Sequence, residues 1–129
     1  MALPVRILIV DDERPLAALL AQAFAQDGHT VLQAADGIDC MNKMANFRPD
    51  VVIMDIMMPR LDGVDTTRLI RRNRSYEDTV IVALSARADE DTRRRMREAG
   101  ADVFMRKPFV IVRLVERVQQ LLAARTGMR

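Results

Sequence analysis

The most constraining feature of this 129-residue sequence is an alternation between short, mainly apolar runs and segments with helical periodicity. Each run is followed by a segment in which apolar residues recur every three or four positions, as on one face of a helix. Strands that are apolar throughout are typical of parallel sheets covered by helices on both faces. The pattern therefore predicts an α/β fold with a doubly wound parallel sheet. The five expected strands are residues 5–10, 30–34, 51–54, 80–84 and 103–105.

One of the five expected helices differs from the others. The helix predicted at Glu90–Ala99 is nearly all charged, with Met96 and Ala99 as its main apolar contributions, and Gly100 is placed to end it. A helix with few buried contacts has low local stability, so we expect this one to shift at small energetic cost. The other helices are expected from Leu16 to about Asp27, over residues 38–45 and 65–72, and from Ile111 to Leu122.

Composition excludes several classes of protein. With 50% hydrophobic residues the chain can bury a core, and its length suits one domain. No apolar run approaches the ~20 residues of a membrane span, and the run at residues 5–10 is too short for a signal peptide. The single cysteine, Cys40, has no disulfide or metal-binding partner. These features predict a cytoplasmic protein that does not associate with membranes.

Charge is distributed unevenly along the chain. Residues 1–64 carry 5 basic and 9 acidic side chains, whereas residues 65–129 carry 15 basic and 9 acidic ones. A net charge of +2 and only 4% aromatic residues give little reason to expect direct nucleic-acid binding. The run from Arg93 to Arg97 fits either a solvated helix face or a surface for a partner. We expect Cys40, Met41 and Met44 to pack in a helix and His29 to lie at the surface.

Polar side chains follow four of the five expected strands, and the second strand alone delivers none. In parallel sheets these positions meet at one edge, where binding sites form beside the topological switch point. Three aspartates meeting there would repel one another unless a cation joined them. Carboxylates without histidine or thiolate favour a hard ion such as Mg²⁺, with Mn²⁺ as an alternative. The residues in question are Asp11, Asp12 and Glu13, then Asp55, Ser85 and Lys107.

These groups suit phosphoryl chemistry. A carboxylate can act as the nucleophile and become an aspartyl-phosphate, while Lys107 and Ser85 could contact phosphoryl oxygens. The chain has no Gly-rich nucleotide-binding loop of either common type. Each residue also has a simpler interpretation: Asp11 and Asp12 could cap the helix that begins near Pro15, and Ser85 could cap the helix at residues 90–99. Asp55 could be a loop acid ahead of a turn, and Lys107 a solvated side chain.

Four sequence strings, in this order and each at a strand end, resemble the receiver domains of two-component response regulators. They are ILIVDDE at residues 7–13, DIMMPRLDG at 55–63, LSA at 84–86 and KPF at 107–109. The likeness is to a single-domain receiver of the chemotaxis-regulator kind and covers residues 5–122, leaving a short tail at 123–129 and no output domain in this chain. It implies a flavodoxin-like sheet of five parallel strands in the order 2-1-3-4-5.

The resemblance also implies a role for each matching residue. Asp55 corresponds to the aspartate phosphorylated by a sensor histidine kinase or a histidine phosphotransfer protein. Asp11, Asp12 and Asp55, with the backbone carbonyl of Met57, correspond to the Mg²⁺ ligands. Lys107 corresponds to the family's invariant lysine, with a cis bond to Pro108. Ser85 corresponds to the switch hydroxyl and Phe104 to the switch aromatic, for which a core role is the alternative.

The implied output is a change of surface rather than conventional catalysis. The chain would assist its own phosphorylation and dephosphorylation. The surface formed by the helix at 90–99, the strand at 103–105 and the helix from Ile111 would then bind a downstream protein or a second copy of the chain. One alternative is a phosphohydrolase of the haloacid dehalogenase type, although the spacing of Asp11-Asp12-Glu13 does not fit its Asp-x-Asp motif. Another is an interaction module on the same fold that is not phosphorylated.

Overall fold

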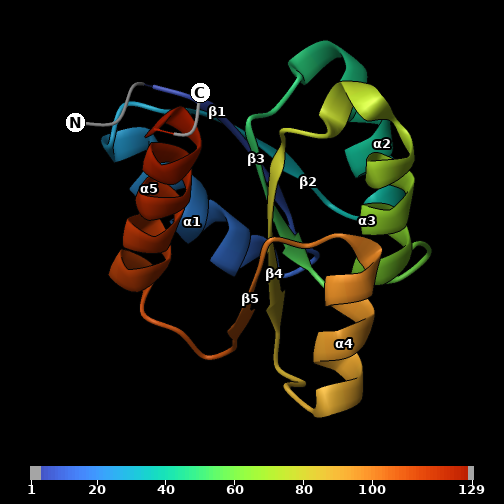
Figure 1. The fold of residues 1–129 in the computed structure, drawn as a ribbon. Coiled ribbons are helices and arrows are strands. Elements are labelled where there is room, and N and C mark those ends of the chain that lie inside the picture. The colour runs from blue at the N-terminus through green and yellow to red at the C-terminus, as the bar shows by residue number, and fades with distance from the viewer. Residues whose placement is uncertain (1–3, 128–129) are drawn as a thin grey trace.

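The computed structural model describes residues 4–127, with side chains described as far as residue 124. Five parallel strands form one sheet in the order β2-β1-β3-β4-β5, which confirms the expected topology (Figure 1). β2 lies on one side of β1 and β3 lies on the other, so the strand order changes direction between β1 and β3. The strands are β1 (Arg6–Val10), β2 (Thr30–Ala34), β3 (Val51–Asp55), β4 (Val80–Ser85) and β5 (Val103–Arg106).

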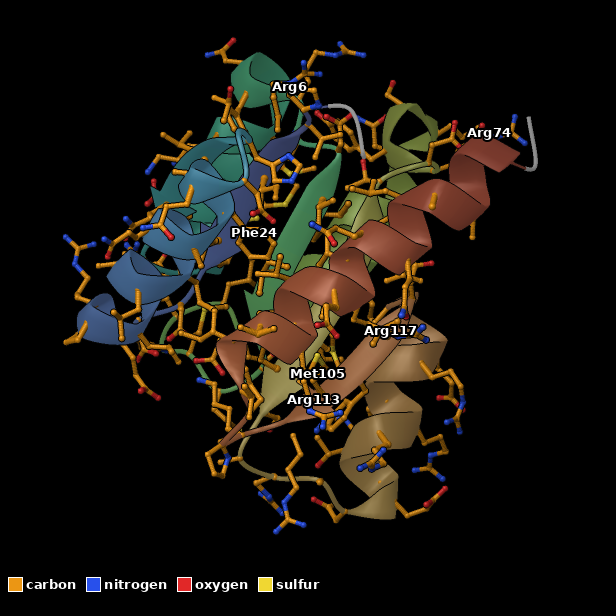
Figure 2. All side chains as sticks on the ribbon, turned by 90° about the vertical axis from the view of Figure 1, so that its left-hand side faces the viewer. Arg6, Phe24, Arg74, Met105, Arg113 and Arg117 are labelled. Atoms are coloured by element: carbon orange, nitrogen blue, oxygen red, sulfur yellow. The ribbon has the colours of Figure 1, made fainter. Side chains whose placement is uncertain are left out.

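Helices cover both faces of the sheet. In Figure 1, α1 and α5 lie on one side of the strands, and α2, α3 and α4 lie on the other. Every residue of β3 and β4 is buried, as expected for central strands covered twice. Phe24 of α1 points toward the sheet in the core on the α1 and α5 side (Figure 2). The helices are α1 (Arg14–Gln26), α2 (Gly37–Phe47), α3 (Gly63–Arg72), α4 (Glu90–Ala99) and α5 (Ile111–Gly127), with a short 3-10 helix at Arg74–Tyr76.

Aspartate side chains fix where three of the helices begin. Asp36, Asp62 and Asp89 each accept a hydrogen bond from the backbone N–H three residues later, at the first turns of α2, α3 and α4. The first turn of α1 contains Pro15, and its N-cap residue Glu13 forms no side-chain capping bond. The interpretation of Asp11 and Asp12 as caps of α1, and of Ser85 as the cap of α4, is therefore wrong.

Gly63 is required by a close approach between α3 and β3. A Cβ atom at this position would lie 2.4 Å from the carbonyl oxygen of Asp55 and 2.7 Å from the Cα atom of Ile56. No side chain fits there without a shift of the backbone. The first turn of α3 therefore packs directly against the carboxyl end of β3, so the two segments are positioned together.

The single histidine and the single cysteine are both buried. His29 was expected at the surface, and this prediction is wrong. Its Nδ1 atom accepts a hydrogen bond of 3.1 Å from the backbone N–H of Val5, and its ring lies 6.3 Å from that of Phe24. Cys40 packs in the core beside Met44, as expected, and burial raises the pKa of its thiol to about 12.

Arg71 of α3 joins four segments of the chain. Its Nε atom donates to the carbonyl of Gly100 at 2.9 Å, and Nη1 donates to the carbonyl of Tyr76 at 2.9 Å. Its Nη2 atom lies 3.0 Å from Asp102, whose carboxylate also accepts the backbone N–H of Ile81 at 2.8 Å. We call this group the Arg71 cluster. It fixes the carboxyl end of α4 against α3 and the start of β4.

The carboxyl end of the chain differs from expectation. The helix predicted to end near Leu122 continues to Gly127, so much of the expected tail is helical, and residues 128–129 lie outside the described part of the chain. Among residues 4–127, no helix is both long enough and apolar enough to cross a membrane.

Candidate functional site

Two strand ends place three aspartates close together at one edge of the sheet. Asp11 and Asp12 follow β1, and Asp55 is the last residue of β3, the neighbouring strand. One carboxylate oxygen from each of the three lies within 4.8 Å of the others. The side chains of Asp11 and Asp55 are only 1% and 5% exposed, whereas Asp12 is exposed. The sequence-based prediction that these residues meet is therefore correct.

Lys107 supplies the positive charge that faces the two buried carboxylates. Its Nζ atom lies 3.3 Å from Asp11 Oδ2 and 3.4 Å from Asp55 Oδ1. The turn after β5 brings it there: the Lys107 N–H donates to the Ser85 carbonyl at 2.8 Å, and the bond to Pro108 is cis, as expected. Lys107 also lies 3.4 Å from Glu13, the third of the acidic residues expected after the first strand.

The electrostatics of this site indicate an excess of negative charge. Burial, and then the charge of the neighbouring Asp11, raise the pKa of Asp55 to about 7, although Lys107 acts in the opposite direction. Burial tends to lower the pKa of Lys107, but the Asp55 and Asp11 carboxylates outweigh it and raise that pKa. One lysine thus does not neutralise the buried carboxylates. Oxygen donors of this kind, without histidine or thiolate, fit a hard divalent cation.

The raised pKa of Asp55 predicts a pH-dependent stability in metal-free protein. Between about pH 4 and pH 7 the folded chain binds more protons at Asp55 than the unfolded chain, so this group lowers the free energy of unfolding as pH rises. We therefore expect Asp55→Asn to be more stable than the original chain near pH 8 and closer to it near pH 5. Urea unfolding in EDTA measures the difference.

Asp65→Asn is the matched control for that measurement, because Asp65 is an exposed carboxylate whose described ion pair is with Arg68 on the same helix. Asp36 and Asp89 have lowered pKa values. The stability that they contribute changes with pH only below about pH 4, which is outside the range from pH 5 to pH 8 compared here. A gap between the original chain and Asp55→Asn that stayed constant from pH 5 to pH 8 would contradict the prediction.

Ser85, Met57 and Phe104 lie at or near the same edge but are not joined to the aspartates by a described contact. Ser85 is fully buried, and its Oγ atom accepts the backbone N–H of Arg87 at 3.0 Å. Met57 is 56% exposed in the loop after β3. Phe104 of β5 is partly buried against the α4 side of the core, and the guanidinium carbon of Arg93 lies 4.8 Å from its ring centroid.

Sequence reasoning missed a polar residue after β2. Asp36 lies there, caps α2 and forms an ion pair with Arg60 of the loop after β3. The prediction that the second strand delivers no polar group to this edge is therefore wrong. The signal was available, because Asp36 followed by Gly37 and Asp39 is a typical helix start. The pair ties the loop that contains Met57 to the neighbouring helix.

Comparison with known proteins identifies relatives of this chain. Residues 7–119 match the family model described as the response regulator receiver domain. The response regulator MprA of Mycobacterium sp. (strain KMS) is 40% identical over 120 residues, covering 93% of this chain and 51% of that protein. MprA of Mycobacterium tuberculosis (strain ATCC 25177 / H37Ra) is 38% identical over 118 residues, covering 92% and 50%. The chain thus spans about half the length of these curated relatives.

Solved structures agree with this comparison. The chemotaxis protein CheY4 of Vibrio cholerae superposes with a TM-score of 0.87 at 26% identity, covering 92% of this chain and 99% of that one. The signal receiver domain of a response regulator from Bermanella marisrubri gives a TM-score of 0.82 at 32% identity, covering 91% and 97%. The similarity therefore extends over nearly the whole of both solved domains.

Proposed function

The chain belongs to the response regulator receiver domain family, and we propose that Asp55 is its phosphoacceptor. A receiver domain is a regulatory unit of a two-component system and not a conventional enzyme. The observation that carries the proposal is the meeting of Asp11, Asp12 and Asp55 around Lys107 at one sheet edge. Among these, Asp55 is both buried and the last residue of the central strand β3.

The proposed reaction is transfer of a phosphoryl group to the Asp55 carboxylate. A carboxylate oxygen forms a bond to phosphorus while the bond from phosphorus to the donor breaks, and the donor leaves with that electron pair. For a phosphohistidine donor, the leaving imidazole nitrogen is part of a sensor kinase or a histidine phosphotransfer protein. Lys107 is positioned to exchange its contact with Asp55 for one with a phosphoryl oxygen, which stabilises the added charge.

A divalent cation fits the residues present. Asp11, Asp12 and Asp55 would hold it, with the backbone carbonyl of Met57 as a further oxygen donor. We propose Mg²⁺, with Mn²⁺ able to substitute, because both prefer oxygen donors. When bound, the cation supplies positive charge to the phosphoryl oxygens during transfer.

Ser85 and Phe104 are proposed to pass the phosphorylation state to the surface. Movement of the Ser85 hydroxyl toward a phosphoryl oxygen would break its hydrogen bond to the Arg87 N–H and so release the segment before α4. Phe104 packs beside Met96 and Ala99, so inward rotation of its ring would alter the contact between β5 and α4. The resulting change at α4, β5 and α5 would be read by a partner protein in the cytoplasm.

Acetyl phosphate tests the proposed function without a cognate kinase. We expect the chain to gain one phosphoryl group in the presence of Mg²⁺ and none in EDTA, because the acidic cluster needs a cation to accept further negative charge. Intact-mass spectrometry measures the incorporation. A chain that gained no phosphoryl group with Mg²⁺, and bound neither Mg²⁺ nor beryllofluoride, would instead be an interaction module that is not phosphorylated.

A further inference from the structure

An arginine-rich strip lies along the open edge of the sheet. β5 is an edge strand, and α4 and α5 lie on either side of it (Figure 1). Figure 2 shows the side chains of Arg113 and Arg117 on the side of α5 that faces β5 and α4. Two arginines of α4 and one of β5 continue this surface. The members of the strip are Arg93, Arg97, Arg106, Arg113 and Arg117, and all five are exposed.

The members of the strip on α4 and β5 lie on the α4 side of the sheet edge, and those on α5 lie across β5 from them. Arg93 lies over the ring of Phe104, and Arg97 is one helical turn further along the same side of α4. Arg106 is two residues after Phe104 on β5 and so points to the same face of the sheet. On α5, Gln119 donates to Asp27 at the end of α1. The helix surface of Arg113 and Arg117 is turned away from that contact.

The positive charge of the strip is not balanced within the described residues. None of the five arginines forms an ion pair with a carboxylate in the part of the chain described. Asp102 lies beside the strip, but its carboxylate is held by Arg71 and by the Ile81 N–H. Asp91 pairs with Arg94, outside the strip. Arg93 instead uses its Nε atom to donate to the carbonyl of Ala88 at 3.0 Å.

A second copy of the chain is a poor occupant for this surface. A symmetric dimer places the same patch on both sides of the interface, so residues of the strip would face one another. Because the strip contains five unpaired cations, such contacts bring like charges together at a substantial cost. Self-association through this surface would place the five arginines against like charge, and only the carboxylates at the border of the strip, such as Glu98 and Glu116, could offset it.

Nucleic acid also fits less well than a protein. Glu90 and Asp91 on α4, Glu98 on the same helix and Glu116 on α5 are exposed around the strip. A phosphate backbone is charged along its whole length and would pass over these carboxylates as well as the arginines. A short acidic segment of a protein can contact the arginines without extending over these carboxylates. Arginine is also the residue that pairs with carboxylates in a bidentate manner.

We propose that the arginine-rich strip binds an acidic segment of a downstream partner protein. This rests on the proposed function and names the partner chemistry of its output surface. The stacking of Arg93 on Phe104 links the strip to phosphorylation, because inward rotation of the ring would remove that contact and reposition the guanidinium group. Release of the Arg93 guanidinium from the ring frees it to pair with a carboxylate of the segment, so we expect stronger binding in the phosphorylated state.

A fluorescein-labelled, glutamate-rich peptide of about a dozen residues with two leucines is the probe. Fluorescence anisotropy compares its affinity for the original chain, for Arg97→Glu/Arg113→Glu, and for the control Arg72→Glu/Arg74→Glu. The control changes the same charge at exposed arginines on and after α3. We expect a loss of about tenfold or more in the strip variant and a clearly smaller loss in the control. Beryllofluoride with Mg²⁺ should strengthen binding to the original chain.

Three results would overturn the proposal. The first is an equal loss in the strip and control variants. The second is a DNA duplex of matched charge that binds as tightly as the peptide and loses affinity in the same variant. The third is a beryllofluoride-dependent dimer, seen by sedimentation, that the strip variant alone abolishes. Acetyl phosphate labelling of both variants keeps the two proposals distinct: an unlabelled original chain contradicts the proposed function, whereas labelled variants with unchanged peptide affinity contradict only this inference.

Discussion

Replacing Asp55 by Asn is expected to abolish phosphoryl incorporation from acetyl phosphate. The amide has nearly the same shape as the carboxylate but lacks a nucleophilic oxygen, so the proposed aspartyl-phosphate cannot form. The other buried carboxylate of the site, Asp11, accepts the Glu13 N–H at 2.8 Å, so one of its oxygens already has a partner. Intact-mass spectrometry after incubation with Mg²⁺ measures the loss.

Asp65→Asn is the control for this variant and should be labelled as fully as the original chain. Its side chain is exposed and pairs with Arg68 on the same helix. Asp55→Asn should stay folded, because the substitution removes a buried charge that faces another carboxylate. Full labelling of a folded Asp55→Asn chain would show that another side chain accepts the phosphoryl group.

Replacing Lys107 by Met is expected to cause the largest loss of stability. Among the described residues, Lys107 is the one whose ammonium group contacts both Asp11 and Asp55, and its side chain is only 13% exposed. Removing one member of a buried charged group leaves the others unpaired, at a cost of ~3–5 kcal/mol. Urea unfolding in EDTA near pH 8, where Asp55 is ionised, measures this loss. Added Mg²⁺ should recover part of it.

Lys43→Met is a matched control, because Lys43 is the other lysine of the chain. It pairs with Asp39 one turn away on α2, and both side chains are about one-third exposed. Pairs of this kind contribute roughly 0.3–0.5 kcal/mol. If Lys107→Met and Lys43→Met lowered the free energy of unfolding by similar amounts, the account of the buried charges would be wrong.

The fold could be predicted because apolar residues recur with a different spacing in its strands than in its helices. The continuous apolar runs at β3 and β4 indicated strands covered on both faces, and both are buried throughout. Glu90–Ala99 was located with its observed bounds because an acidic first turn and Gly100 mark its ends. The helix from Ile111 was predicted too short, since the small and charged residues after Leu122 carry no apolar signal, yet they continue α5.

The meeting of the acidic residues was also predictable, because parallel strands bring their carboxyl ends to one edge. What could not be predicted is which side chains form contacts with residues far away in the sequence. His29 is buried because the Val5 N–H, 24 positions away, has the ring nitrogen as its acceptor. Arg60 reaches Asp36 only because the loop after β3 passes over the start of α2. Such contacts depend on tertiary packing, which local sequence patterns do not encode.

The Arg71 cluster holds the carboxyl end of α4 in place, so any tilt of this helix would turn about that end as a pivot. Long-range bonds hold its carboxyl end, whereas the polar bonds described at its amino end, from Thr92 to Asp89 and from Arg93 to Ala88, are local. A helix of 10 residues is ~15 Å long, so a tilt of about ten degrees about the pivot moves its free end by roughly 2–3 Å. The amino end, which follows Ser85, would travel furthest, while Gly100 would hardly move.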